Sequence, residues 1–267
     1  MKSIRFLMAL AAFGPALGGV PAGAGGLGGP SPYTEAIAAA AANWPPAELG
    51  ELKRALEPDK EQVALLCFVT HGDDLYLGLA QYQVIAAPFD RAVAALDDIP
   101  GYVGIFDGLL VSRVEQKEEG RLSVFSEQRI GVPLARNEKD EIIYWISEQA
   151  APRRKVYRYQ LKSSNHLRSD DGLIVVEAAG SGKTEYTEYD FYDADWGLAR
   201  ALGRDRIWKE NIRGLAQTTL AIRLKAEHPD WSPAQILKTS LARAKAVKAA
   251  ACISSGRPLP AAAAAVK

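Results

Sequence analysis

The order of predicted elements between residues 74 and 227 constrains this chain more than any other feature of its sequence. A strand-like run at 75–85 leads into a short helix that starts at Pro88, where the missing N–H of proline costs nothing. After a Pro-Gly pair at 100–101, about six strand-like runs follow one another without an intervening helix. An amphipathic helix then covers residues 205–227. We predict an α+β fold in which a curved antiparallel sheet wraps around this long C-terminal helix, with extra N- and C-terminal helices.

The strand-like runs are separated by short polar turns, which is typical of an antiparallel meander. They cover residues 109–115, 122–130, 142–147, 155–161, 173–178 and 184–192. The turn at 180–184 reads Gly-Ser-Gly-Lys-Thr and resembles a phosphate-binding loop, but that motif needs a glycine where Glu177 stands and a helix after it. The alternating residues that follow are typical of a strand, so we predict a β-turn here.

The helical pattern extends beyond this segment at both ends. We predict short helices at 33–43, 46–56 and 102–106, and a further helix at 232–248 that Ser232 can cap. The apolar run at 61–70 fits either a strand that pairs with 75–85 or a helix. In the long helix, one stripe is expected to lie on the concave face of the sheet: Trp208, Ile212, Leu215, Thr219 and Ile222.

Composition excludes one class of function. The 267 residues include 32 Lys plus Arg and 32 Asp plus Glu, so the formal net charge is zero. A protein that binds nucleic acid through phosphate contacts needs a basic excess, and none is present. The hydrophobic content of 48% is enough for a core of ordinary size.

The first residues have the pattern of an export signal. Lys2 and Arg5 precede a short apolar run at 6–17, and a small-x-small cleavage pattern stands at 22–24. The run is far shorter than the roughly 20 residues that span a bilayer. We therefore predict a signal peptide at 1–24, a periplasmic or secreted protein, and a mature chain that begins at Gly25.

The sequence holds two cysteines, Cys67 and Cys252. Cys67 lies in an apolar run and is expected to be a buried free thiol. A disulfide with Cys252 is the alternative in an oxidising compartment. Neither cysteine has a second ligand at the spacing of a metal site, and the three histidines (His71, His166 and His228) are dispersed, so no metal or cofactor is predicted.

Two carboxyl groups in the last predicted strand could point either into the interior or out to solvent. Glu188 and Asp190 share one face of the run at 184–192, while Thr187, Tyr189 and Phe191 share the other. If the carboxyls pointed into an apolar cavity, burial would raise their pKa and make them candidate acids. We expect them to point outward, because the opposite face is the more apolar one.

These features together resemble the START-like superfamily, also called the SRPBCC or helix-grip fold. The resemblance is carried by residues 85–90 (Ile-Ala-Ala-Pro-Phe-Asp), residues 96–102 (Leu-Asp-Asp-Ile-Pro-Gly-Tyr), the strand 184–191 and the segment 196–227. It implies a sheet and a long C-terminal helix around a hydrophobic cavity that in relatives holds lipids, sterols, quinones or polyketides, and some relatives are cyclases or hydrolases. No family-wide catalytic residue exists to be carried over.

Together with the local patterns, the resemblance leads us to divide the chain into a signal peptide (1–24), a linker with an N-terminal helical extension (25–60), a helix-grip domain (61–227) and a C-terminal helix with a disordered tail (228–267). The predicted function is an exported binding protein for a hydrophobic small molecule or lipid. Seven candidate ligand-binding residues follow: Tyr102, Phe106, Tyr157, Tyr159, Trp208, Ile212 and Leu215. Peripheral contact with a membrane during ligand exchange is left open.

Two other functions stay open at this point. A cyclase- or hydrolase-type enzyme would need an ionisable group facing the cavity, for which Glu188, Asp190, Arg129 and Lys155 are the nearest candidates. An interaction module with a core filled by side chains would need bulky residues at most inward positions. Apart from these candidates, no catalytic motif stands out.

Overall fold

The computed structural model describes Ile37 and residues 45–56, 63–68, 76–129, 136–180, 182–194 and 204–247. The helices are α2 (Ala47–Ala55), α3 (Phe89–Asp97), the 3-10 helix η1 (Pro100–Tyr102), α5 (Arg204–Glu227) and α6 (Pro233–Ala244). The strands are β1 (Ala64–Phe68), β2 (Tyr76–Ile85), β3 (Leu109–Glu118), β4 (Arg121–Gln128), β5 (Glu138–Ala150), β6 (Arg153–Ser164), β7 (Leu167–Ala178) and β8 (Thr184–Ala194). The predicted signal peptide, linker and C-terminal tail lie outside the described residues.

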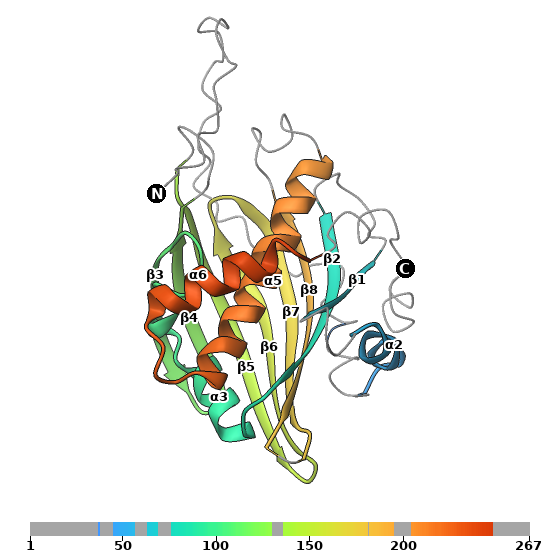
Figure 1. The fold of residues 1–267 in the computed structure, drawn as a ribbon. Helices are drawn as coiled ribbons and strands as arrows, with labels where there is room; N and C mark the ends of the chain where they lie inside the picture. The colour runs from blue at the N-terminus through green and yellow to red at the C-terminus, as the bar shows by residue number, and fades with distance from the viewer. Residues whose placement is uncertain are drawn as a thin grey trace, which may run out of the picture.

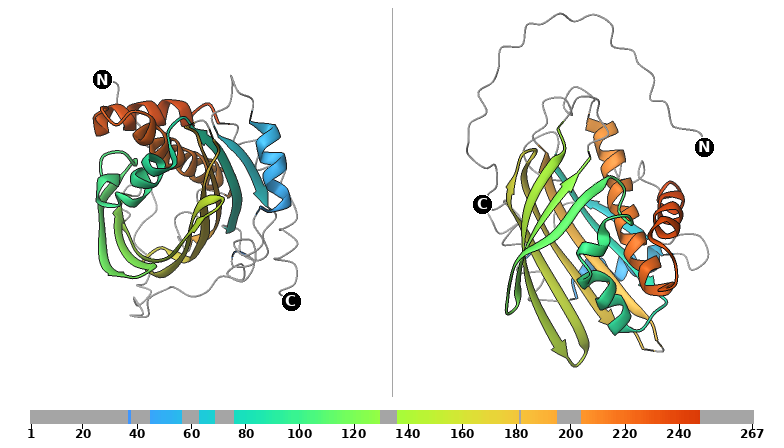
Figure 2. Two further views of the ribbon diagram at one scale, coloured as in Figure 1. Left: turned by 90° about the horizontal axis from the view of Figure 1, so that it is seen from below. Right: turned by 90° about the vertical axis from the view of Figure 1, so that its left-hand side faces the viewer.

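The strands form one antiparallel sheet in the order β1-β2-β8-β7-β6-β5-β4-β3 (Figure 1). Seen from below, the sheet curves around α5, while α2 lies on the outside of the curve (Figure 2). This is the predicted helix-grip arrangement. The run at 61–70, which fitted a strand or a helix, forms β1 and pairs with β2.

Helix α5 is the central element because it is covered on two sides. Its sheet-facing stripe includes Trp208 and Ile212, which pack on Leu79, and Ile222 and Ala226, which pack with Tyr157 and Tyr186. A second stripe meets α6 through Ala216, Leu220, Ala221 and Leu224, which pack with Ile236 and Ala244. The C-terminal helix α6 therefore covers the outer side of α5.

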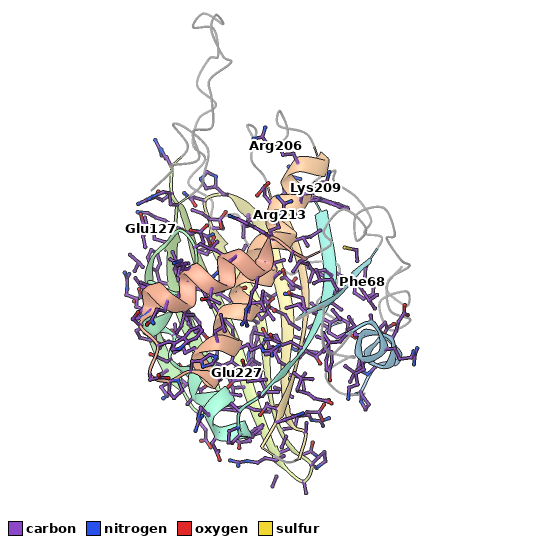
Figure 3. The ribbon with its side chains drawn as sticks, in the orientation of Figure 1. Phe68, Glu127, Arg206, Lys209, Arg213 and Glu227 are labelled. Atoms are coloured by element: carbon purple, nitrogen blue, oxygen red, sulfur yellow. The ribbon has the colours of Figure 1, made fainter. Side chains whose placement is uncertain are left out.

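Polar contacts cap α6 and join α5 to α6 and to the segments around Ala86 and Ile105. Ser232 caps α6 in a full capping box with Gln235, as predicted for this residue. The amide Nε2 of Gln217 in α5 donates to the Ile105 carbonyl and to Ser240 Oγ of α6, each at 2.8 Å. At the end of α5, Glu227 Oε1 accepts from the Ala86 backbone N–H at 2.7 Å (Glu227 is labelled in Figure 3).

A second core lies on the convex face of the sheet, where α2 packs. Leu49 and Leu52 of α2 meet a cluster formed by β1, β2, β7 and β8. In that cluster Phe68 stacks on Tyr189 and Phe191, with ring centroids 6.1 and 5.8 Å apart (Phe68 is labelled in Figure 3). The apolar face of β8 is therefore buried against the N-terminal extension, and the other face of β8 points toward α5.

The bonding state of Cys67 differs from what we expected. It is buried in β1, as predicted, but it is disulfide-bonded and not a free thiol. Cys252 is the only other cysteine of the sequence, and it lies outside the described residues. Spacing in sequence could not decide this question, because a disulfide depends on the distance between backbones in the folded chain.

Candidate functional site

The inner face of the sheet carries a buried polar cluster opposite α5. Gln81 of β2 pairs with Glu188 of β8, and Gln83 pairs with Tyr186. The Thr219 hydroxyl of α5 lies 3.2 Å from both Gln81 Oε1 and Glu188 Oε2. Glu188 and Asp190 therefore point inward and are 7% and 3% exposed, so the expectation that they point outward is wrong.

Glu188 is the most densely bonded member of the cluster. Its Oε2 accepts from Gln81 Nε2 at 3.0 Å and from the Tyr186 hydroxyl at 2.8 Å. Burial, and to a lesser degree the negative charge of Asp190, raises the pKa of Glu188 to about 7. The folded chain therefore holds this proton more tightly than the unfolded chain, and this carboxyl favours folding most below pH 4.5 and progressively less as the pH rises to about 7.

Asp190 connects β8 to β6 and β7. Its Oδ1 accepts from the Tyr159 hydroxyl at 2.9 Å, and burial raises its pKa to about 6 in spite of that bond. Asp170 of β7 forms a hydrogen bond with Asp190, and its pKa is raised well above the usual range by burial first and by the charge of Asp190 second. Two carboxyls that share a proton in this way cannot both ionise easily.

A glycine makes the bond between Tyr159 and Asp190 geometrically feasible. Gly172 lies on β7 between the two residues, and a Cβ at this position would come within 1.9 Å of Tyr159 Cζ. The tyrosine ring therefore lies across Gly172, where any side chain would displace it. Nothing in the alternation of the strand pattern points to this role.

A second pair of carboxyls lies on β5. Glu138 and Asp140 are hydrogen-bonded to each other, and burial is the largest cause that raises the pKa of each. The charge of Asp140 also raises the pKa of Asp170. The charge of His166, in contrast, lowers the pKa of Asp140. Five carboxyls from three strands thus face the interior: Glu138, Asp140, Asp170, Glu188 and Asp190.

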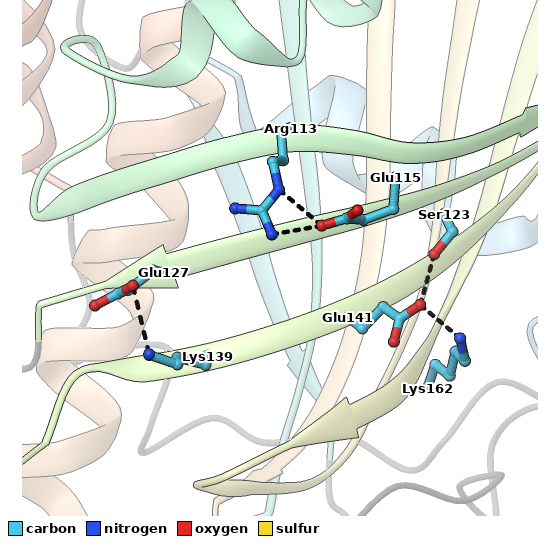
Figure 4. A network of polar contacts seen from close by, with 7 residues as sticks. All are labelled: Arg113, Glu115, Ser123, Glu127, Lys139, Glu141 and Lys162. Carbon is cyan, nitrogen blue, oxygen red and sulfur yellow. Dashed lines mark hydrogen bonds and ion pairs between the residues drawn. The ribbon is translucent and has the colours of Figure 1, made fainter.

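Several charged side chains on the outer face of the same sheet form ion pairs with one another. On β3–β5 Arg113 bonds to Glu115, Lys139 lies 3.7 Å from Glu127, and Lys162 lies 2.5 Å from Glu141 (Figure 4). Among the described residues no lysine or arginine forms an ion pair with any of the five inner carboxyls. Among the described residues, Gln83 Oε1, Glu138 Oε2, Asp140 Oδ1 and Asp170 Oδ1 are buried on the inner face and have no partner apart from a neighbouring carboxyl.

An apolar wall adjoins the polar cluster. The backbone of α5 lies closest to α3, α6 and β2. Opposite the other strands, side chains on the inner face keep accessible surface: Leu122, Ile142, Tyr144, Ile146 and Ile174 are half-buried. The Tyr144 and Tyr159 rings lie 5.6 Å apart where the wall meets the carboxyls. The wall and the cluster together offer an apolar surface with polar groups at one position, as in sites for amphiphilic ligands.

The seven predicted ligand-binding residues fall into three places. Tyr102 and Phe106 stack at 4.5 Å near the C-terminal half of α5, where Tyr157 donates to Asp97. Tyr159 belongs to the buried polar cluster, where its hydroxyl donates to Asp190. Trp208, Ile212 and Leu215 pack with Leu79 and Cys67 along the N-terminal half of α5. Whether these residues touch a ligand stays a prediction.

Of the four ionisable groups considered earlier, two do not join the cluster. Lys155 is paired with Asp97 at 2.7 Å, and Arg129 is exposed. Sequence reasoning placed Thr219 on the sheet-facing stripe of the long helix, but it missed the strand residues that join it in the cluster: Gln81, Gln83, Asp170 and Gly172. Gln81 and Gln83 alternate with apolar residues in a strand, and this is the one signal that could have indicated a polar inner face.

The remaining motifs are structural. The glycine-rich turn joins β7 to β8, with positive φ at Gly180 and Gly182 and a Lys183 N–H bond to the Gly180 carbonyl at 3.0 Å, so the predicted β-turn is confirmed. No group of three or more His, Cys, Asp or Glu residues in the described segments is placed to hold a metal ion. None of the helices in these segments is long and apolar enough to cross a membrane.

Comparisons with known proteins found similarity in structure but no match in sequence. No family model matches the sequence, and no curated protein matches it either. Among solved structures, the lipid transfer and protein localization domain of human StarD13 superposes with a TM-score of 0.50 at 10% identity, covering 70% of this chain and all of that domain.

Two further solved structures are similar at lower scores. A STAR-related lipid transfer protein from Xanthomonas axonopodis gives a TM-score of 0.45 at 10% identity, with 71% of this chain and 97% of that chain covered. The Zhui aromatase/cyclase from a Streptomyces species gives 0.41 at 15% identity, with 64% and 94% covered. The fold shared with the StarD13 domain is the helix-grip arrangement that the resemblance implied.

Replacing Gly172 tests the construction of the site. Gly172→Ala should displace Tyr159, break its bond to Asp190 and lower the free energy of unfolding by about 1–3 kcal/mol, measured by urea denaturation. Gly214→Ala is the matched control, because nothing lies within 4 Å of a Cβ there and alanine favours a helix. Equal stability of Gly172→Ala and the unchanged protein would contradict this account of the cluster.

Proposed function

We propose that this chain is an exported binding protein for a hydrophobic small molecule or lipid, held between the inner face of the sheet and α5. The observation that carries the proposal is the half-buried apolar wall formed by Leu122, Ile142, Tyr144, Ile146 and Ile174. These side chains lie on the side of the sheet that faces α5, yet they keep accessible surface. Apolar surface of this kind gains free energy when a ligand covers it.

The fold supports this use. The helix-grip arrangement places a curved sheet and one long helix around a common interior, and the StarD13 domain that shares the fold is described as a lipid transfer domain. The polar cluster adds the second requirement of a small-molecule site, which is a small number of polar groups that fix the orientation of an otherwise apolar ligand.

A cyclase- or hydrolase-type enzyme is the second candidate, and one observation favours it. Glu188 and Asp190 face the interior with pKa values of about 7 and about 6, which suits a group that gives or takes a proton near neutral pH. In that case the bound molecule would leave the protein chemically altered, whereas a binding protein would release it unchanged.

A pair of adjacent isoleucines tests where the ligand lies. Ile142 faces inward on β5 and Ile143 faces outward, and both are half-buried. Ile142→Trp should fill the interior and weaken binding of the neutral hydrophobic dye Nile red about tenfold or more, measured by fluorescence titration. Ile143→Trp should bind the dye as the unchanged protein does. Equal binding by the two variants would place the ligand elsewhere.

Export is proposed on two grounds. The sequence of residues 1–24 has the pattern of a signal peptide, and a disulfide such as that of Cys67 persists mainly in oxidising compartments. We expect the intact mass of the protein recovered from the exported fraction to correspond to a chain that starts at Gly25. A mass that still includes residues 1–24 would contradict cleavage at this point.

A further inference from the structure

One tyrosine hydroxyl on the inner face of the sheet has no hydrogen-bonding partner. Three other tyrosines on this face, Tyr157, Tyr159 and Tyr186, each donate to a carboxyl group. The hydroxyl of Tyr144 on β5, in contrast, bonds to none of the residues that the structure describes. Tyr144 is half-buried, and its hydroxyl oxygen keeps accessible surface. Tyrosine hydroxyls in such places usually find a partner, and here a bound molecule can supply one.

The register of the sheet places this hydroxyl in the middle of the apolar wall. Tyr144 pairs with Leu122 of β4 on one side and with Tyr159 of β6 on the other. Along β5, Ile142 and Ile146 are its neighbours on the same face, one in each direction. Leu122 and both isoleucines are half-buried. A molecule that covers this wall therefore meets apolar side chains on both sides of an unpaired hydroxyl.

The surroundings of Tyr144 decide which kind of partner fits. Burial first, and then the charges of Asp170, Glu188 and Asp190, raise the pKa of Tyr144. The hydroxyl therefore keeps its proton and can donate it in a hydrogen bond, for which the matching group is an acceptor oxygen. A carboxylate oxygen would bring negative charge close to three acids, which is unfavourable. A neutral oxygen brings no such charge.

We propose that Tyr144 anchors the ligand by donating a hydrogen bond to a neutral carbonyl oxygen that has apolar groups on both sides. This inference rests on the proposed function and specifies the chemical class of the ligand. Ile142 and Ile146 pack against the two apolar arms, and the hydroxyl between them fixes the position of the oxygen. Without the hydroxyl, the carbonyl would lose its bonds to water on binding and gain none in return.

Two molecules of nearly equal shape test the proposal. Dipentyl ketone carries a carbonyl oxygen between two alkyl arms, and in its methylidene analogue a CH₂ group replaces that oxygen. Each is titrated into the full chain loaded with Nile red, and displacement of the dye is followed by fluorescence. Because the two molecules differ in their solubility in water, the quantity compared is the change in affinity of each one between the unchanged protein and a variant.

Tyr144→Phe removes the hydroxyl and keeps the ring. It should weaken binding of the ketone about threefold or more, and leave binding of the methylidene analogue unchanged. Tyr82→Phe is the matched control, because Tyr82 packs with α2 on the convex face of the sheet, and it should bind both molecules as the unchanged protein does. Equal loss for the two molecules in Tyr144→Phe, or no loss for the ketone, would overturn the proposal.

A spectroscopic measurement on the unchanged protein keeps the proposal testable if Tyr144→Phe does not fold. The carbonyl stretch of bound dipentyl ketone, labelled with ¹³C at the carbonyl carbon, is recorded by infrared difference spectroscopy. A hydrogen bond from Tyr144 should lower the stretching frequency relative to that of the ketone in hexane. A frequency equal to that in hexane would overturn the proposal.

The outcomes separate this inference from the proposed function. Ketone binding that Tyr144→Phe leaves unchanged and Ile142→Trp weakens would leave the hydrophobic site standing and remove the anchor. Failure of Nile red and of both molecules to bind the unchanged protein would overturn both proposals.

Discussion

Burial of β8 on both of its faces is the constraint on which the rest of this structure depends. Successive residues of a strand point to opposite sides, so packing Tyr189 and Phe191 under α2 forces Glu188 and Asp190 toward α5. A shift of register by one residue would exchange the two sets. It would bring the carboxyls against Phe68 and the apolar part of α2, where no partner could bond to them.

The polar inner face is tolerated because its acids can remain protonated and because neighbouring groups bond to them. Tyr159, Tyr186, Gln81 and Thr219 supply donors from four different elements, and Gly172 leaves the space that Tyr159 needs. A core built only for stability would place apolar residues here, since a buried unpaired carboxyl costs more than it contributes. Packing alone therefore does not explain why five carboxyls face the interior.

The sequence predicted the order of the elements because local signals mark them. Pro88 and Ser232 each precede a helix, and Gly180 and Gly182 take positive φ in the last hairpin. The extent of the strands was predicted less well. The run starting at residue 142 begins at Glu138 in the structure, because inward-facing acids gave it the appearance of a charged turn.

The direction of the acids could not be predicted for a physical reason. A rule that the more apolar face of a strand points inward assumes that only one face is buried, and it failed at Glu188 and Asp190 because α2 buries the other face. The disulfide of Cys67 and the bond from Tyr159 to Asp190 depend on distances between segments that are far apart in sequence. Of the seven predicted ligand-binding residues, Tyr159 is the one that the structure brings into contact with the polar cluster.

Carboxyls that face the interior without a cation should hold their protons well above the usual pH range. Titration of the side-chain carboxyl carbons by NMR tests it directly. We expect one glutamate to titrate at about pH 7 and one aspartate at about pH 6, and the glutamate signal to be absent from Glu188→Gln. A spectrum in which every carboxyl titrates below about 4.5, the usual range of such groups, would contradict the account.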